Sequence, residues 1–311
     1  MTVAIPVFNE EAQIAGCLEA VVAQTYQHLL EILVVDGGSS DDTREVACRF
    51  AFVRVLDNPR RIRAAGLNLA IAAAKGDLIV RVDARTRIAS DYVERCVDVL
   101  EATGAAIVGG SMRLTAQSPA ERAIRTAMTS RLGAGGAQFR RHQSHARYVD
   151  TVYLGAYRVD TVVRLGGYDE WFGGNEDAEL AYRARRAGGV FLDPAISSTY
   201  AVRTGLGPLC QQYFRYGANR TRTMIKHPRS IALRQLAVPC LLLGLVSPWR
   251  RPVAVGYAAL VAGRAAVEMT RDPAAAPWLL AVVPMMHGAW GAGFLRALAG
   301  ARSRPSTPSP G

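Results

Sequence analysis

The first 110 residues alternate short apolar runs with longer amphipathic segments. Apolar runs of about five residues are typical of buried strands, and the segments between them have helical length and periodicity. The predicted strands are Val3–Val7, Glu31–Val35, Phe52–Leu56, Leu78–Val82 and Ala106–Gly110. The predicted helices are Glu11–Gln24, Asp41–Arg49, Arg61–Ala74 and Ser90–Thr103. Because strands that alternate with helices form a mostly parallel sheet covered on both faces, the pattern predicts an α/β fold.

A polar turn follows each of the first four predicted strands. The turns are residues 8–10, 36–40, 57–59 and 83–85. Parallel strands end at the same edge of a sheet, and ligands of such sheets bind beyond their carboxyl ends. Asp36 precedes two glycines, which allow the backbone to approach a ligand closely, and its carboxylate can accept hydrogen bonds from a base or a ribose. The turns therefore predict a nucleotide site at this edge.

A second candidate site lies between Gly166 and Gly188, where a glycine-rich aromatic loop runs into Glu176, Asp177 and a helix. A helix N-terminus favours the ionised form of a carboxylate, whereas burial and the adjacent Glu176 raise its pKa. A carboxylate held between these influences can accept a proton from a substrate hydroxyl. The alternative is an ordinary acidic helix start, because Asp and Glu are common in first turns.

Composition adds an anionic partner to this picture. The 311 residues carry a formal net charge of +11, almost all of the positive charge being arginine, which suits a nucleoside diphosphate or an anionic membrane. We expect no nucleic-acid partner, since no zinc spacing, RRM-type aromatic motif or basic heptad array is present. The five cysteines form no Cys-x-x-Cys pair and are expected to be reduced, buried thiols on the cytosolic side.

Beyond Ser230 the chain becomes strongly apolar. Pro273–Leu295 is an uncharged run of 23 residues, long enough to cross a bilayer, whereas Gln235–Trp249 and Pro252–Gly263 are short for a span and fit interfacial or re-entrant helices. The alternative is a buried helix hairpin. We therefore expect a catalytic domain over residues 1–230, hydrophobic membrane-associated helices over 231–300 and a disordered tail over 301–311.

Several motifs in order resemble those of a known family. Residues 5–11 (Ile-Pro-Val-Phe-Asn-Glu-Glu), 34–43, 76–83 and 175–180 (Asn-Glu-Asp-Ala-Glu-Leu) resemble the inverting family 2 glycosyltransferases, which have the Rossmann-related GT-A fold. Residues 151–157, 166–189 and 212–217 are similar, more narrowly, to the succinoglycan-type bacterial exopolysaccharide glycosyltransferases. The resemblance covers roughly residues 1–230. It implies a GT-A-like α/β domain followed by a hydrophobic, membrane-associated helical region.

The resemblance also implies an activity and the residues that carry it. The enzyme would move a hexose from a nucleoside diphosphate sugar, with UDP as the expected nucleotide, to a lipid-linked or polysaccharide acceptor, with inversion. This reaction would serve exopolysaccharide or cell-envelope glycan synthesis at the cell membrane, with the catalytic domain facing the cytoplasm. Pro6, Asn9, Glu10, Asp36, Asp83 and Arg85 would bind the donor, Asp177 beside Glu176 would be the catalytic base, and Trp171, Arg215, Tyr216 and Arg220 would close on the diphosphate or acceptor.

One departure from the family pattern concerns the metal. The family commonly has Asp-x-Asp or Asp-x-His where the third residue helps to bind Mg²⁺ or Mn²⁺, but this chain has Asp83-Ala84-Arg85. Asp83 remains as a metal ligand, whereas arginine has only donors and cannot ligate a cation. Arg85 could instead neutralise the departing diphosphate. Alternatively, the protein is a catalytically weak or inactive nucleotide-sugar or glycan-binding subunit of a membrane glycan-synthesis complex.

Overall fold

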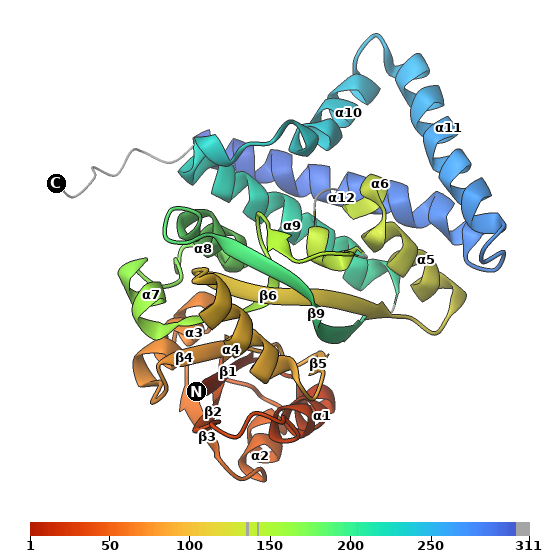
Figure 1. Ribbon diagram of the computed structural model, residues 1–311. Coiled ribbons are helices and arrows are strands. Elements are labelled where there is room, and N and C mark those ends of the chain that lie inside the picture. The colour runs from red at the N-terminus through yellow and green to blue at the C-terminus, as the bar shows by residue number, and fades with distance from the viewer. Residues whose placement is uncertain (135–136, 142, 204, 303–311) are drawn as a thin grey trace. The chain divides into compact units, whose positions relative to one another are not determined.

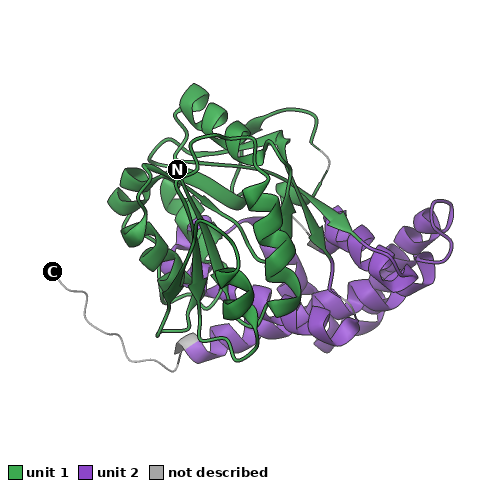
Figure 2. Ribbon diagram, turned by 90° about the horizontal axis from the view of Figure 1, so that it is seen from below, with its two compact units in different colours: residues 1–115, 137–201 green, residues 116–136, 202–311 purple. Residues whose placement is uncertain are grey.

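The computed structural model describes residues 1–134, 137–141, 143–203 and 205–302, which form two compact units (Figure 2). Unit 1 contains residues 1–115 and 137–201, and unit 2 contains residues 116–136 and 202–311. This division differs from the boundary expected at residue 230, because the helix over Leu206–Lys226 belongs to unit 2. Most of the expected disordered tail, residues 303–311, lies outside the described residues.

Unit 1 is built on one mixed sheet with the strand order β3-β2-β1-β4-β8-β6-β9-β5, and β7 pairs with β9 (Figure 1). β1 to β4 are mutually parallel, as predicted, whereas β8 runs antiparallel to both β4 and β6. The strands are β1 (Thr2–Val7), β2 (Glu31–Asp36), β3 (Val53–Asp57), β4 (Leu78–Arg81), β5 (Thr86–Ile88), β6 (Ile107–Thr115), β7 (Arg147–Tyr148), β8 (Tyr153–Arg158) and β9 (Val190–Ala201).

Helices cover both faces of this sheet because successive strand residues point to opposite sides. Val3 and Ile5 of β1 pack with α1, α2 and α4, whereas Ala4 packs with α3, α7 and α8. The two buried clusters leave the carboxyl ends of the strands to the connecting loops, which confirms the predicted α/β architecture. The helices of unit 1 are α1 (Glu11–Val22), α2 (Thr43–Cys48), α3 (Arg63–Ala73), α4 (Tyr92–Thr103), α7 (Val159–Arg164), α8 (Glu176–Ala184) and the 3-10 turn Gln138–Arg140.

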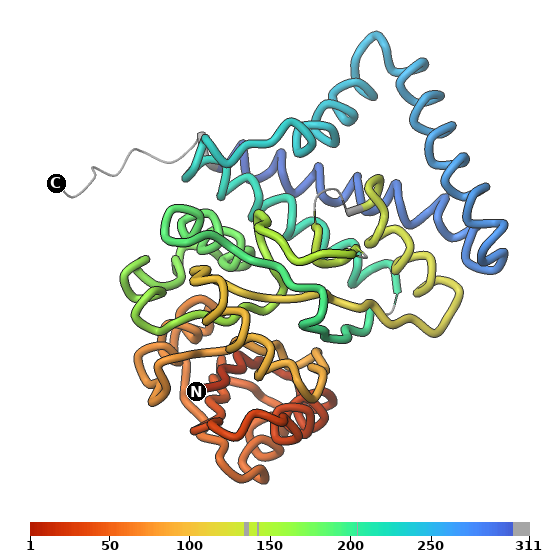
Figure 3. Tube along the Cα trace, in the orientation of Figure 1, coloured from red at the N-terminus to blue at the C-terminus, as the bar shows by residue number. Residues whose placement is uncertain are grey.

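Unit 2 is helical. It contains α5 (Pro119–Thr129), α6 (Arg131–Ala134), α9 (Leu206–Lys226), α10 (Ala237–Val246), α11 (Arg250–Met269), α12 (Ala276–Arg302) and the 3-10 turns Pro228–Ser230 and Leu233–Gln235. α9 and α12 run side by side (Figure 3). Their backbones touch at two glycines, since a Cβ on Gly217 would lie 1.8 Å from the Trp290 carbonyl oxygen and one on Gly293 would lie 2.0 Å from that of Phe214.

Two helices of unit 2 could cross a membrane by length and composition: α11 over Arg250–Met269 and α12 over Ala276–Gly300. They differ in burial, because half of the apolar stretch of α12 is covered by the rest of the protein, whereas only 17% of the apolar stretch of α11 is covered.

The cysteines correct one expectation. Cys17 and Cys96 are buried free thiols, as predicted, but Cys48 and Cys240 are exposed.

The contact between α9 and α12 makes a testable prediction. Gly217→Ala should lower the free energy of unfolding by about 3 kcal/mol, because its methyl group must push the two backbones apart. Gly207→Ala in the same helix is the matched control: a Cβ there meets nothing within 4 Å, so it should stabilise by up to about 1 kcal/mol through helix propensity. Equal denaturation midpoints for the two variants would contradict the close contact.

Candidate active site

The loops that follow β1 and β2 are hydrogen-bonded to each other at the carboxyl edge of the sheet. The backbone amide of Asn9 donates to Ser39 Oγ at 2.9 Å. The side-chain oxygen of Asn9, Oδ1, accepts from the backbone amide of Ser40 at 2.8 Å. Ser39 Oγ in turn lies 2.6 Å from Asp36 Oδ1. Asn9 has φ +52°, a left-handed conformation that asparagine tolerates better than most residues. The structure therefore brings the predicted donor residues Asn9 and Asp36 together, and Pro6 lies nearby on β1, opposite Val35.

The loop after β4 joins this group through an ion pair. Arg85 Nε lies 2.9 Å from Glu10 Oε1, and the two side chains are 41% and 19% exposed. The Glu10 amide also donates to Thr43 Oγ1 at 2.7 Å, which fixes the backbone at the start of α1. Because partly exposed ion pairs contribute little to stability, Arg85 can leave Glu10 for a stronger anion at small cost. Both residues were predicted to bind the donor.

A buried arginine connects the sheet to the helix that begins with Glu176. Arg81 follows Ile79 on the face of β4 that α3 and α8 cover, so the alternation of the strand directs it towards them. Its Nε lies 3.0 Å from Asp83 Oδ1, and its Nη1 lies 3.3 Å from Glu176 Oε1. Arg63, at the start of α3, adds a contact of 2.6 Å to the same Glu176 oxygen.

This network keeps two carboxylates ionised. Burial alone would raise the pKa of Glu176, but the guanidinium groups of Arg63 and Arg81 outweigh burial and hold that pKa below its ordinary value. Burial also tends to raise the pKa of Asp83, but Arg81 and Arg63 outweigh it and lower that pKa. Glu176 is fully buried and Arg81 is 3% exposed, so Glu176 depends on Arg63 and Arg81 for charge compensation and Arg81 depends on Glu176 and Asp83.

Asp177 differs from its neighbour. Burial and then the negative charge of Glu176 raise its pKa, and the opposing influence of Arg81 and Arg63 does not cancel these effects. Its side chain is half-buried, and its Oδ1 lies 2.8 Å from the Ala178 amide, in the first turn of α8. Asn175, immediately before the helix, has φ +65° and sets the direction of entry. The chain thus places a carboxylate of raised proton affinity beside one that stays charged, an arrangement suited to a base.

The predicted closing residues occupy two places. Trp171 is exposed in the loop before α8 and packs edge-on against the buried Phe172, with 5.2 Å between ring centroids. Arg215, Tyr216 and Arg220 all lie on α9 in unit 2. Tyr216 Oη accepts from Gln212 at 3.0 Å, and Arg220 donates to the Ser230 carbonyl at 2.5 Å and to Gln235 at 2.9 Å. Arg220 thus stabilises the turn after α9.

Sequence reasoning missed Arg81 and Arg63. A signal for Arg81 was present, because a charged residue inside the apolar run Leu-Ile-Val-Arg-Val is rarely buried without a partner. No comparable signal marks Arg63, whose contact with Glu176 exists only because α3 and α8 cover the same face of the sheet.

The side chains near Asp83 do not by themselves complete a divalent-cation site. Both carboxylate oxygens of Asp83 accept from Arg81, at 3.0 and 3.4 Å, and Arg85 offers no lone pair. Within the described residues, no group of three His, Cys, Asp or Glu side chains could hold a metal ion. Such a cation prefers six or more oxygen ligands, or octahedral geometry, which this donor set does not supply.

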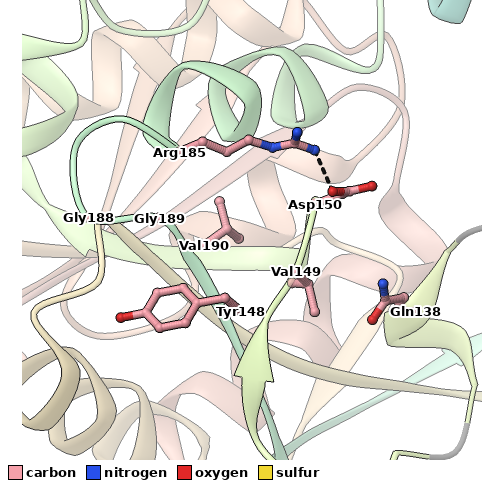
Figure 4. Close-up of a pocket in the computed structure, with 8 residues that line it drawn as sticks. All are labelled: Gln138, Tyr148, Val149, Asp150, Arg185, Gly188, Gly189 and Val190. Atoms are coloured by element: carbon pink, nitrogen blue, oxygen red, sulfur yellow. Dashed lines mark hydrogen bonds and ion pairs between the residues drawn. The ribbon is translucent and has the colours of Figure 1, made fainter. Parts of the chain in front are cut away.

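A separate hollow of about 500 Å³ lies in unit 1 beside β7 and the start of β9 (Figure 4). Eight residues line it, and the ion pair between Arg185 and Asp150, at 2.5 Å, crosses one side. None of the predicted site residues is among the eight. The candidate active site is therefore the loop edge with the Arg81 network, and this hollow is no part of it.

Comparisons with known proteins agree with this assignment. Residues 2–158 match the model of glycosyl transferase family 2. The chain is 35% identical to the succinoglycan biosynthesis protein ExoA of Rhizobium meliloti, over 97% of this chain and 96% of that protein. Two solved structures are similar in fold, with TM-scores of 0.62 and 0.52, identities of 23% and 13%, and 96% of this chain covered.

The first of these structures is the mannosyltransferase PcManGT from Pyrobaculum calidifontis in complex with GDP-Man and Mn²⁺, covered over 86% of its length. The second is S. aureus TarS residues 1–349 in complex with UDP, covered over 91%. At these identities both show the fold alone, and that fold is GT-A. The family match, the full-length relative and the fold agree with the motif order: the chain belongs to glycosyl transferase family 2 and is a glycosyltransferase.

Proposed function

We propose that this glycosyltransferase moves a hexose from a uridine diphosphate sugar to a lipid-linked or polysaccharide acceptor, with inversion, in exopolysaccharide or cell-envelope glycan synthesis. One observation supports the proposal most strongly: unit 1 contains both a half-buried Asp177 of raised pKa and loops after β1, β2 and β4 that are joined by hydrogen bonds and an ion pair. The name of the Rhizobium meliloti relative supports the pathway, and the UDP complex of TarS supports the nucleotide.

On the donor side, the Asp36 and Asn9 loops receive the nucleoside. Ser39 already occupies both Asp36 oxygens, so a ribose or base must share or replace hydrogen bonds that the loop makes to itself. Asp83 is held ionised by Arg81 and faces the same edge, where it orients the sugar or the ribose by accepting hydrogen bonds from their hydroxyl groups.

On the acceptor side, Asp177 accepts the proton of the attacking hydroxyl. The hydroxyl oxygen forms a bond to the anomeric carbon as the bond from that carbon to the diphosphate oxygen breaks, and the electron pair leaves with the diphosphate. One displacement inverts the centre, so no protein nucleophile is required. Trp171, Arg215 and Tyr216 are proposed to close on the acceptor or diphosphate; Arg220 supports the turn after α9.

The charge of the leaving diphosphate is neutralised in part by Arg85. Its guanidinium is 41% exposed and bound to Glu10 by a single ion pair, so an incoming diphosphate can take it over. This role explains why an arginine can stand where the family usually has a metal ligand. Residual dependence on Mg²⁺ or Mn²⁺ is expected, because the diphosphate itself supplies oxygen ligands.

We place the enzyme at the cell membrane with its catalytic unit in the cytoplasm. The apolar helices of unit 2 support membrane association, and the described cysteines are all free, as expected of a reducing compartment. The rival function is a nucleotide-sugar or glycan-binding subunit of low activity. Position 85 favours it, but the raised pKa of Asp177 serves no purpose in simple binding.

The base is tested by Asp177→Asn, which keeps size and hydrogen bonding but removes the proton acceptor. Turnover with the best donor from a panel of nucleoside diphosphate sugars should fall roughly 10²–10⁴-fold, with donor affinity little changed. Asp160→Asn, an exposed acidic residue in the first turn of α7, is the matched control and should have no effect. Near-native turnover of Asp177→Asn would show that Asp177 is not the base and is only an acidic residue in the first turn of α8.

The Arg63 contact predicts a pH effect. Arg63 lowers the pKa of Asp177, so Arg63→Gln should raise that pKa further. Because the base must be deprotonated, activity is lost as pH falls through its pKa, and the acid limb of the kcat/KM profile should move to higher pH. Arg60→Gln removes an exposed arginine that pairs with Glu170 and should leave the limb in place. A shift to lower pH would contradict the assignment.

The role of Arg85 is tested by titrating EDTA against turnover in the wild type, Arg85→Ala and Arg85→Asp. If the guanidinium neutralises the diphosphate, the wild type should tolerate more chelator than either variant, and Arg85→Asp should depend most on added Mn²⁺. The affinity for UDP in EDTA should fall in both variants. Identical metal curves for the three proteins would contradict this role.

A further inference from the structure

Helix α12 is a core helix of unit 2. Five of its apolar side chains, Ala276, Leu279, Val282, Val283 and Met286, are completely buried by protein. Trp290 and Gly293 lie in backbone contact with α9, and the Thr221 hydroxyl donates to the Phe294 carbonyl at 3.3 Å. A helix that touches its neighbour this closely cannot enter a bilayer without it.

The composition of helix α9 is unsuited to the hydrocarbon region of a membrane. Its sequence carries Arg215, Arg220, Arg222 and Lys226, besides several amides. Each cation costs about 3 kcal/mol at the centre of a membrane helix by insertion measurements. The pair of α9 and α12 therefore stays outside the hydrocarbon core, although α12 is long and apolar enough to span it.

The exposed apolar surface of unit 2 lies instead on α10, α11 and the turn between them. Val246 is 82% exposed, Trp249 73% and Val255 69%. The two helices meet at a corner (Figures 1 and 3). α10 packs on α12 where Leu242 lies against Gly291, whereas Leu243 and Val246 of the same helix are exposed. Soluble proteins seldom expose contiguous apolar patches larger than a few hundred Å².

Neither helix of this corner is suited to a full span. α10 has ten residues, about 15 Å of helix against about 30 Å of hydrocarbon. The second half of α11 is tied to protein: Glu268 is buried, pairs with Arg264 at 2.9 Å and accepts from the Thr126 hydroxyl at 3.1 Å. Before Arg264, the uncharged stretch of α11 is residues 252–263, and most of its side chains are exposed. Its length suits insertion into one leaflet.

We propose that α10 and the first half of α11, residues 237–263, form a monotopic anchor that lies in the interface of an anionic bilayer, and that α12 does not cross it. The exposed Trp249, between the two helices, would lie at the level of the lipid headgroups, where membrane proteins are rich in tryptophan. The exposed Arg250 and Arg251 beside it can reach lipid phosphates. The net charge of +11 favours the same surface. This proposal refines the membrane association given above and rests on none of the sugar chemistry.

The test is flotation of full-length protein, synthesised in a cell-free system, with phosphatidylcholine vesicles that contain or lack phosphatidylglycerol. The double variant Leu243→Glu/Val246→Glu should lose at least about tenfold in partitioning to either vesicle. Arg250→Gln/Arg251→Gln should lose roughly 25-fold with anionic vesicles and little with neutral ones, because each basic residue contributes about fivefold at an anionic surface.

Two single substitutions serve as controls. Val163→Glu introduces one such charge at an exposed apolar position of unit 1, and Leu280→Glu introduces one on the exposed side of α12. Both should float as the wild type does. Loss of flotation in Leu280→Glu with retention in the α10 variant would make α12 the anchor and overturn the proposal, as would failure of the wild type to float. Donor hydrolysis by the non-floating variant would show that the anchor and the transfer activity are separate.

Discussion

The ion pairs of Arg81 are the interaction on which the candidate active site of unit 1 depends. Arg81 contacts both Asp83, at the end of the parallel strands, and Glu176, at the start of α8. Removing one partner of a buried pair typically costs 3–5 kcal/mol, because the remaining charge is left without compensation. The position of α8 against the sheet and the ionisation of both carboxylates therefore share one origin.

The same network explains how two adjacent carboxylates take different roles. The guanidinium groups of Arg63 and Arg81 lower the pKa of Glu176, which therefore stays charged. Its negative charge raises the pKa of Asp177, and at Asp177 the two arginines do not cancel this effect. Environments that separate the pKa values of neighbouring acids are characteristic of catalytic pairs. The donor loops complete the site with ordinary hydrogen bonds between Asn9, Ser39 and Asp36. The proposed base and donor loops all lie in unit 1, whereas Arg215 and Tyr216 lie on α9 in unit 2.

The sequence predicts the parallel half of the sheet well, because each strand there is a local apolar run followed by a polar turn. It does not reveal β9, which contains Pro194 and a polar Ser-Ser-Thr run and is a strand because β6, β5 and β7 pair with it, with a bulge beside the proline. The motif order predicts Asn9, Asp36 and Asp177 as site residues, and this stays a prediction, whereas the contact of Arg63 with Glu176 depends on packing that no local pattern encodes. Hydropathy likewise cannot distinguish α11 from α12; burial can.

The most direct test of this account is a double-mutant cycle on Arg81 and Glu176, read as the free energy of unfolding of Arg81→Met, Glu176→Gln and the double variant. Each single change removes part of the charge compensation of a buried partner, so the two losses should overlap. We predict a double variant more stable than the sum of the single losses by at least about 1 kcal/mol. Strict additivity would show that the two side chains do not support each other, and would contradict the assignment of this pair as the link between strand and catalytic helix.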